Sequence, residues 1–186
     1  MLATPLQSHM DAAAPVAGAA SISSHTVLTI FHLSGDLLAV DASAVQEIAL
    51  MAELSTPRGL PPLIAGFLNL AHRPVPIVRL ARLLNLPEPT LGLYTQILIL
   101  RDGRESPVGW IVDRVAQIIP VGQEDVLPVP ENHSYRDCAK GIVTRDGASI
   151  SILAPDRVLL EQERRCILDF QAREQERLRE LEQAEP

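Results

Sequence analysis

The feature that most constrains the fold is a regular series of short apolar runs separated by turn residues, between about residues 25 and 154. The runs are rich in Val, Ile and Thr, and Gly, Pro, Asp or Ser residues bound them, which is typical of β-strands. The chain carries 15 prolines among 186 residues, and proline disfavours long helices because it interrupts their hydrogen bonds. We therefore expect roughly nine short strands in a mainly β fold, either a barrel or a sandwich.

Several of these segments predict local structure. Ser34-Gly35 and Asp146-Gly147 each separate two apolar runs and predict tight hairpin turns. The stretch "GFLNLAHRPVPIVRL" is unusual, because a polar turn at 71–74 interrupts expected strands at 66–70 and 75–78. The remaining expectations are a strand or helical turn at 44–50, a loop at 54–66, a short helix at 78–87 ended by Pro87, a strand at 94–100, and two strands or one bent strand at 107–121.

The two ends of the chain differ from this β region. Residues 1–24 are mostly Ala, Ser and Pro, so we expect a disordered leader. Residues 155–186 predict a charged helix that begins near Pro155 and Asp156. Its first half is expected to dock and its second half to protrude, because apolar residues become sparse after Phe170. The alternative is a helix that pairs with another chain, although sustained apolar heptads are lacking.

Composition excludes several classes of partner. The net charge is −7 and Lys140 is the only lysine, so the concentrated positive surface that nucleic acids need is not expected. No apolar run approaches the ~20 residues that a membrane span requires. The first basic residue is Arg58, which argues against a secretory signal peptide. We expect a cytoplasmic protein in which Cys138 and Cys166 are free thiols.

Candidate catalytic and metal-binding residues are few. The histidines lack metal-ligand spacing, and neither a nucleophile elbow nor a phosphate-binding Gly-rich loop is present. His133 and Cys138 lie close in sequence, but no third group is evident that would orient them. His72 as a general base has Arg73 beside it, which would lower its pKa. We expect neither an enzyme nor a cofactor site, and a ligand-binding β-barrel is only a remote alternative.

A set of segments in one order resembles a known family, the CheW-like domain of bacterial chemosensory coupling proteins. The segments are "FHLSGDLLAVDASAVQEI" (31–48), "LPPLIAGFLNL" (60–70), "RPVPIVRL" (73–80), "PVGWIVDRVAQII" (107–119), "EDVLPVPE" (124–131) and "KGIVTRDGASISIL" (140–153). Each is weak alone, and together with their spacing they are specific. The resemblance covers about residues 26–162.

The resemblance implies a fold and a function. The fold would be two packed five-stranded, SH3-like β-barrels around a shared apolar core, with a C-terminal α-helix. Within a domain at 25–162, barrel one would hold about 26–72 plus the returning C-terminal segment, and barrel two about 73–150, so that the turn at 71–74 would join the barrels. The implied protein is a non-enzymatic adaptor in a two-component signalling pathway. It would couple the cytoplasmic tip of methyl-accepting chemoreceptors to the regulatory domain of a CheA-type histidine kinase.

The resemblance also implies partner-binding residues. These are Val45, Glu47, Ile48, Gly66, Asn69, Ala71, His72 and Arg73. Val45 would supply an exposed apolar contact, with core packing as the alternative, and Glu47 a charged anchor. Ala71 stands where the family usually has Arg, and His72 where it usually has Gly, so Arg73 would have to serve the same region. The second hypothesis is a divergent module that has lost one partner and uses its C-terminal helix for dimerisation or docking.

Overall fold

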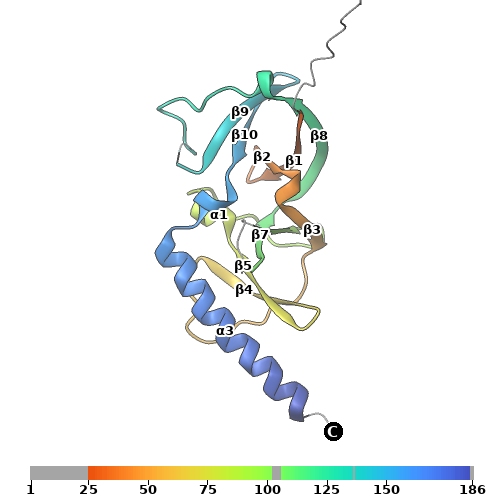
Figure 1. Cartoon of the computed structure of the whole chain (residues 1–186), viewed down its shortest axis with the longest axis vertical. Helices are drawn as coiled ribbons and strands as arrows, with labels where there is room; N and C mark the ends of the chain where they lie inside the picture. Colours follow the sequence, from red (N-terminus) through yellow and green to blue (C-terminus); the bar gives the residue numbers. More distant parts are fainter. Residues whose placement is uncertain (1–24, 102–105, 136, 185–186) are drawn as a thin grey trace, which may run out of the picture.

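The computed structural model describes residues 25–101, 106–135 and 137–184, so the predicted leader at 1–24 lies outside the described residues. Ten strands form two five-stranded sheets, which lie one above the other in Figure 1. The strands are β1 (His25–Leu33), β2 (Asp36–Asp41), β3 (Val45–Leu50), β4 (Ile64–Leu70), β5 (Arg73–Val78), β6 (Gln96–Leu100), β7 (Val108–Val112), β8 (Arg114–Gly122), β9 (Ala139–Arg145) and β10 (Ala148–Leu153). The predicted mainly β fold is therefore confirmed.

The first sheet, sheet A, has the strand order β8-β1-β2-β10-β9. Its β1–β2 and β9–β10 hairpins turn at Ser34-Gly35 and Asp146-Gly147, as the sequence predicts. The second sheet, sheet B, has the order β3-β6-β7-β5-β4. Each sheet contains one parallel pair, β2 with β10 and β5 with β7. The expected closure of each sheet into a barrel stays a prediction.

The expected division between residues 72 and 73 does not match the sheets. It falls inside the β4–β5 hairpin of sheet B, where Leu70 pairs directly with Arg73. Strands β3 and β4, expected in the first barrel, belong to sheet B, whereas β8 pairs with β1 in sheet A. The chain instead crosses between the sheets after β2, through the short 3₁₀ turn Ala42–Ala44, and again between β7 and β8. Sequence could not reveal this, because a polar turn between two apolar strands looks the same in a hairpin and in a crossing.

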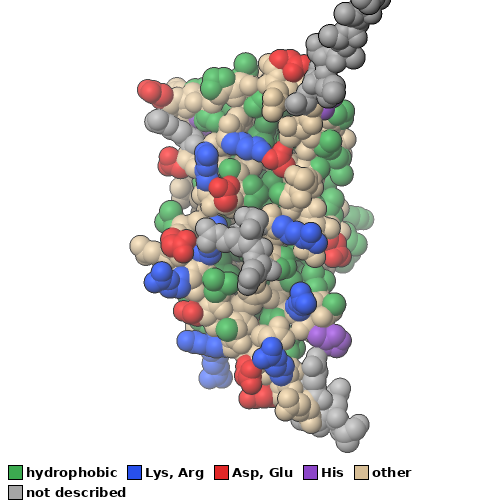
Figure 2. Space-filling view, in the orientation of Figure 1, with side chains coloured by type: hydrophobic (Ala, Val, Ile, Leu, Met, Phe, Trp, Pro, Cys, Tyr) green, Lys and Arg blue, Asp and Glu red, His purple; other side chains and the backbone are tan. Residues whose placement is uncertain are grey.

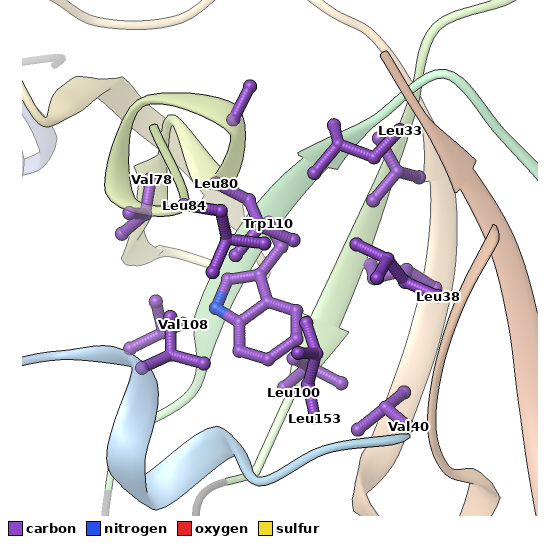
Figure 3. Packing of buried hydrophobic residues seen from close by; sticks show 14 of the residues in the cluster. Leu33, Leu38, Val40, Val78, Leu80, Leu84, Leu100, Val108, Trp110 and Leu153 are labelled. Atoms are coloured by element: carbon purple, nitrogen blue, oxygen red, sulfur yellow. The ribbon is translucent and has the colours of Figure 1, made fainter. Parts of the chain in front are cut away.

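The two sheets share one apolar core, built from residues of both (Figure 3). Trp110 of β7 lies at its centre and is almost fully buried. Leu33, Leu38 and Val40 reach it from sheet A, and Val78, Leu100 and Val108 from sheet B. Each sheet also has its own smaller apolar cluster on residues that this core does not include. Burying this much aliphatic surface explains how a chain with few aromatic residues builds a stable interior.

The helices differ from the sequence expectation in two places. Helix α1 (Leu80–Leu83) ends before Asn85, whose φ of 55° places it in the left-handed region, rather than at Pro87. The single C-terminal helix expected from Pro155 is broken into α2 (Pro155–Val158) and α3 (Glu161–Ala184). At the break Leu159 has an extended backbone, and Val158 and Leu159 both pack in the central core. In the described part of the chain, no helix has the length and apolar character of a membrane span.

Helix α3 lies along β4 and β5 of sheet B over much of its length (Figure 1). Contacts extend past the first half that was expected to dock, because Glu174, Gln175 and Arg177 all hydrogen-bond residues outside the helix. Figure 2 shows acidic and basic side chains interspersed over the lower part of the molecule, where α3 runs. The helix is thus charged toward solvent and attached to the chain's own sheet on the other side.

Candidate functional site

The β4–β5 hairpin carries most of the residues expected to bind partners. Its turn consists of two residues, Ala71 and His72, with φ angles of 46° and 64°. Two positive φ angles in a two-residue hairpin are the geometry that Asn-Gly or Asp-Gly adopts most readily. For an Ala and a His, each left-handed conformation costs about 1 kcal/mol or more. His72, at the position where the resemblance implies a glycine, therefore accepts strain.

Alternate residues of this hairpin point to opposite faces, as the two-residue period of a strand requires. Leu70, Arg73 and Val75 line a cavity on one face. Phe67, Asn69 and Pro74 line a second cavity on the other face, between the sheet and α3. The same short stretch of sequence therefore contributes both to an open surface and to the packing of the C-terminal helix.

The open cavity, called here the β3–β5 cavity, has a volume of about 620 Å³. Its lining residues come from three segments that are distant in sequence: Gln46, Glu47, Leu70, Ala71, Arg73, Val75, Arg101 and Pro107. Pairing of β3 with β6 brings two of these segments together, because Val45 lies opposite Leu100 and the Arg101 amide donates to the Ala44 carbonyl at 2.8 Å. Sheet B thus assembles the cavity from loop ends and strand edges.

Charged groups surround an apolar floor in this cavity. Val75 is buried and packs in the apolar cluster of sheet B, and Leu70 packs against the same cluster. Glu47, Arg73 and Arg101 are exposed, and the Arg101 Nε donates to the Gln46 Oε1 at 3.2 Å. An apolar centre with a charged rim is the usual composition of a protein–protein contact surface. The two arginines and one glutamate suit a partner surface that is apolar with mainly acidic edges.

The structure brings together three of the expected site residues, Glu47, Ala71 and Arg73, around the β3–β5 cavity. Ile48 is on β3 but does not line this cavity, and 39% of its surface is exposed. Val45 is half-buried and packs against the central core, which agrees with the alternative of core packing that the sequence left open. A partner contact at Val45 stays a prediction.

The other three expected residues lie elsewhere on the hairpin. Gly66 is buried, and a Cβ atom there would lie 2.7 Å from both the Leu54 Cβ and the Ser55 carbonyl oxygen. It is a close-approach glycine, as predicted, but the segment that approaches is 54–56, which lies between β3 and β4, rather than a crossing between barrels. Asn69 faces α3, and the carbonyl of His72 accepts a hydrogen bond from Gln175. None of the three lines the β3–β5 cavity.

Sequence reasoning missed Arg101, Gln46 and Pro107. Arg101 directly follows the apolar strand β6, and this position at a strand end was the available signal. It became informative only through the pairing of β3 with β6, which no local pattern specifies. The site is therefore a product of strand order more than of any single motif.

Groups considered for catalysis are engaged differently. The ring of His133 accepts from the Tyr135 amide at 3.1 Å and lies 3.2 Å from the Ser151 Oγ. Burial, followed by the nearby carboxylates of Asp137 and Glu163, raises the pKa of the Cys138 thiol, which disfavours the reactive thiolate. Among the described residues, no group of three or more His, Cys, Asp or Glu side chains could hold a metal ion.

Comparisons with known proteins agree with this architecture. The sequence matches the CheW-like domain family over residues 28–163. It is 30% identical over 112 residues to the chemotaxis protein CheW of Bacillus subtilis (strain 168), covering 60% of this chain and 71% of that protein. It is 28% identical over 141 residues to the chemotaxis protein CheW of Rhizobium meliloti (strain 1021), covering 74% and 89%.

A solved structure supports the same fold. The crystal structure of scaffolding protein TtCheW from Thermoanaerobacter tengcongensis superposes with a TM-score of 0.67 at 21% identity, covering 76% of this chain and 92% of that one. At this identity the likeness concerns the fold. The family match spans well over half of the 186 residues and coincides with both sheets and the start of α3. The chain therefore belongs to the CheW-like domain family, the non-enzymatic scaffolding proteins of chemotaxis.

Proposed function

We propose that this chain couples chemoreceptors to a CheA-type histidine kinase, and that the β3–β5 cavity is a surface on which it binds the regulatory domain of that kinase. The observation that carries the second part is the convergence of Glu47, Ala71 and Arg73, expected at a partner surface, on one open cavity. The first part rests on membership of the family. In this role the chain works in the cytoplasm, at the inner face of the membrane where receptors assemble.

The charges of the cavity suggest how partner choice arises. Arg73 lies two residues after Ala71, on the same cavity, and can supply the cation that the family usually carries at position 71. An exposed arginine sets specificity and association rate more than total affinity. Of the two apolar floor residues, Val75 is already buried, so the partly exposed Leu70 would supply the apolar burial on binding.

The direct test is calorimetric titration of the whole chain with the purified regulatory domain of a CheA kinase from the same cell. We expect a micromolar Kd, equivalent to about −8 kcal/mol. Arg73→Glu should weaken binding at least about tenfold, because it places an acid against an acidic partner edge. The matched control is Arg145→Glu, another exposed arginine at the end of a hairpin strand in sheet A.

Two outcomes would contradict the proposal. Absence of binding by the unaltered chain would exclude coupling to that kinase, and equal weakening by both arginine variants would remove the β3–β5 cavity from the interface.

The double change Ala71→Arg, His72→Gly tests whether the natural turn still supports the kinase contact. Binding that appears only in the double variant would mean that the natural turn has abandoned the usual kinase contact.

The second hypothesis, a module that has lost one partner and dimerises through its C-terminal helix, is tested in parallel. The inward side of α3 is occupied by sheet B, since Gln171 and Gln175 bind carbonyls of β5 and its turn. Self-association through α3 stays a prediction, and it would need the outward face or release of the helix. Co-sedimentation with receptor-containing membranes, together with sedimentation equilibrium of the free chain, distinguishes an adaptor from a dimeric arm.

A further inference from the structure

The turn at the β3–β5 cavity lacks the local features that usually hold such a turn. Ala71 and His72 both have positive φ angles, a conformation that residues other than Gly, Asn and Asp rarely adopt. The following strand begins Arg73-Pro74-Val75-Pro76, and the two prolines have no amide hydrogen to donate to the sheet. The turn therefore carries backbone strain, whereas Pro74 and Pro76 lie opposite Asn69 and Phe67 at non-hydrogen-bonded positions and leave the β4–β5 ladder intact.

Helix α3 contacts the backbone at this end from the face opposite the cavity. The Gln171 Nε2 donates to the Pro74 carbonyl at 2.9 Å, and the Gln175 Nε2 donates to the His72 carbonyl at 3.1 Å. The two glutamines are four residues apart and thus lie on one side of the helix. Their two acceptors flank Arg73, whose own side chain lines the β3–β5 cavity.

A buried acid fixes the position of the two glutamines along the sheet. Glu174 lies between them in the helix and is only 3% exposed. Its carboxylate accepts from the Ser55 Oγ at 2.6 Å and from the Arg177 guanidinium at 2.6 and 3.1 Å. Arg177 also donates to the Ser55 Oγ at 2.9 Å, which closes a three-membered network between α3 and segment 54–56. A buried carboxylate needs these partners, so sliding the helix along the sheet is opposed.

We propose that α3 is a positioning element for the partner-binding hairpin, in which Gln171 and Gln175 hold the strained turn and thereby set the placement of Arg73. The inference rests on the proposed function, because it assigns the placement of a binding residue to groups that do not touch the partner. It gives the C-terminal helix a role within one chain. Affinity for the kinase domain then depends on two amides on the far side of the sheet from the cavity.

The test compares two pairs of glutamine substitutions on the same helix. Gln171→Ala with Gln175→Ala removes both hydrogen bonds, and Gln162→Ala with Gln183→Ala is the matched control at exposed positions. For each, calorimetry against the CheA regulatory domain gives Kd, and hydrogen–deuterium exchange follows residues 69–75. We expect the first pair to raise Kd at least about fivefold, the lower range of coupling between distant sites, and to speed exchange in the hairpin. The control pair should change neither.

A second background separates positioning from loss of folding. His72→Gly relaxes the turn. In that background, Gln171→Ala with Gln175→Ala should therefore cause a smaller rise in Kd and a smaller rise in the hairpin exchange rate than in the natural chain. An equal effect in both backgrounds would overturn the proposal, as would unchanged hairpin exchange or faster exchange with unchanged Kd. If the unaltered chain does not bind the kinase domain, the proposed function fails. Hydrogen exchange alone then tests whether Gln171 and Gln175 hold the turn. Unchanged exchange in the hairpin would refute this role, and faster exchange would support it.

Discussion

Two hairpin turns in this molecule have the same backbone geometry and different means of support. In sheet A, Asp146 and Gly147 join β9 to β10 with φ angles of 49° and 78°. In sheet B, Ala71 and His72 join β4 to β5 with φ angles of 46° and 64°. Asp-Gly adopts positive φ through its own chemistry, whereas Ala-His does so against its preference.

The difference shows where the support for each turn comes from. The Asp146-Gly147 turn is exposed, and a Cβ added at Gly147 would meet nothing within 4 Å. At the Ala71-His72 turn, side-chain amides of α3 donate hydrogen bonds to the carbonyls of His72 and Pro74. The turn with the weaker local sequence is the one beside the proposed binding surface. Local strain near a functional surface commonly persists because surrounding structure over-determines it.

The largest expected effect comes from the glycine within the supported hairpin. Gly66→Ala would place a Cβ atom 2.7 Å from both the Leu54 Cβ and the Ser55 carbonyl oxygen, and we expect the free energy of unfolding to fall by about 3 kcal/mol. Gly147→Ala is the counterpart in sheet A. It has open space but a φ of 78°, so a loss of about 1 kcal/mol is expected. Urea denaturation measures both, and equal losses would contradict the close approach at Gly66.

A smaller loss is expected when the anchor of α3 is removed. Glu174→Ala deletes the acceptor of Ser55 and Arg177, and we expect a loss of about 2 kcal/mol in unfolding free energy, with faster exchange in β4–β5. Glu176→Ala is the control on the same helix. Its pair with Arg179 is exposed at both ends, so its contribution should be no more than about 0.5 kcal/mol. Similar losses in the two variants would show that the buried network does not hold the helix.

Low pH should weaken the same anchor by protonating Glu174. The resulting loss of unfolding free energy should not exceed the loss expected for Glu174→Ala. Hydrogen bonds from Arg177 and then Ser55 lower the pKa of Glu174 below its ordinary value of 4.5. A depressed pKa in the folded state gives stability that is present above pH 4.5 and is lost as pH falls through the folded value. As pH falls below 4.5 and through the lowered pKa of Glu174, we therefore expect the Ala71-His72 turn to lose protection from hydrogen exchange relative to the Asp146-Gly147 turn. Glu174→Gln should remove the pH dependence of this difference.

The smallest effect comes from exchanging the two turns. Replacing Ala71 and His72 by Asp and Gly should stabilise the protein by about 1 kcal/mol, since the new residues favour positive φ. Replacing Asp146 and Gly147 by Ala and His should destabilise it by at least about 1 kcal/mol, because no helix supports that turn. Thermal unfolding of both variants tests the comparison directly. A neutral result in sheet A would mean that Ala-His forms this turn without support.

Much of the local structure followed from sequence. The Ser34-Gly35 and Asp146-Gly147 turns, the strands beside them and the helical character of the C-terminus appear where predicted. Segment 107–121 forms two strands rather than one bent strand, and segment 44–50 is strand β3 preceded by a short 3₁₀ turn. Residues flanking each turn interact over a few positions, so their preferences are visible in the chain itself.

The candidate site was predicted only in part, for a physical reason. Glu47, Ala71 and Arg73 were expected and lie together, whereas Arg101 joined them through strand pairing and Val45 turned toward the core. Whether an apolar residue at the start of a strand, such as Val45, faces solvent or the core depends on which elements pack over it. The family resemblance supplied the residues, and the tertiary structure supplied their surroundings.

By itself, the sequence determined the strands, the glycine-containing turns and the family, because each depends on local conformational preference or on residues in a fixed order. Only the tertiary structure decided that β3 and β4 join sheet B, that β8 joins sheet A, and that α3 covers β4 and β5. Hydrophobic burial is non-directional, so short aliphatic strands do not specify their own neighbours. The observed strand order buries Trp110 almost completely and pairs all ten strands, which requires the two sheets to be in place.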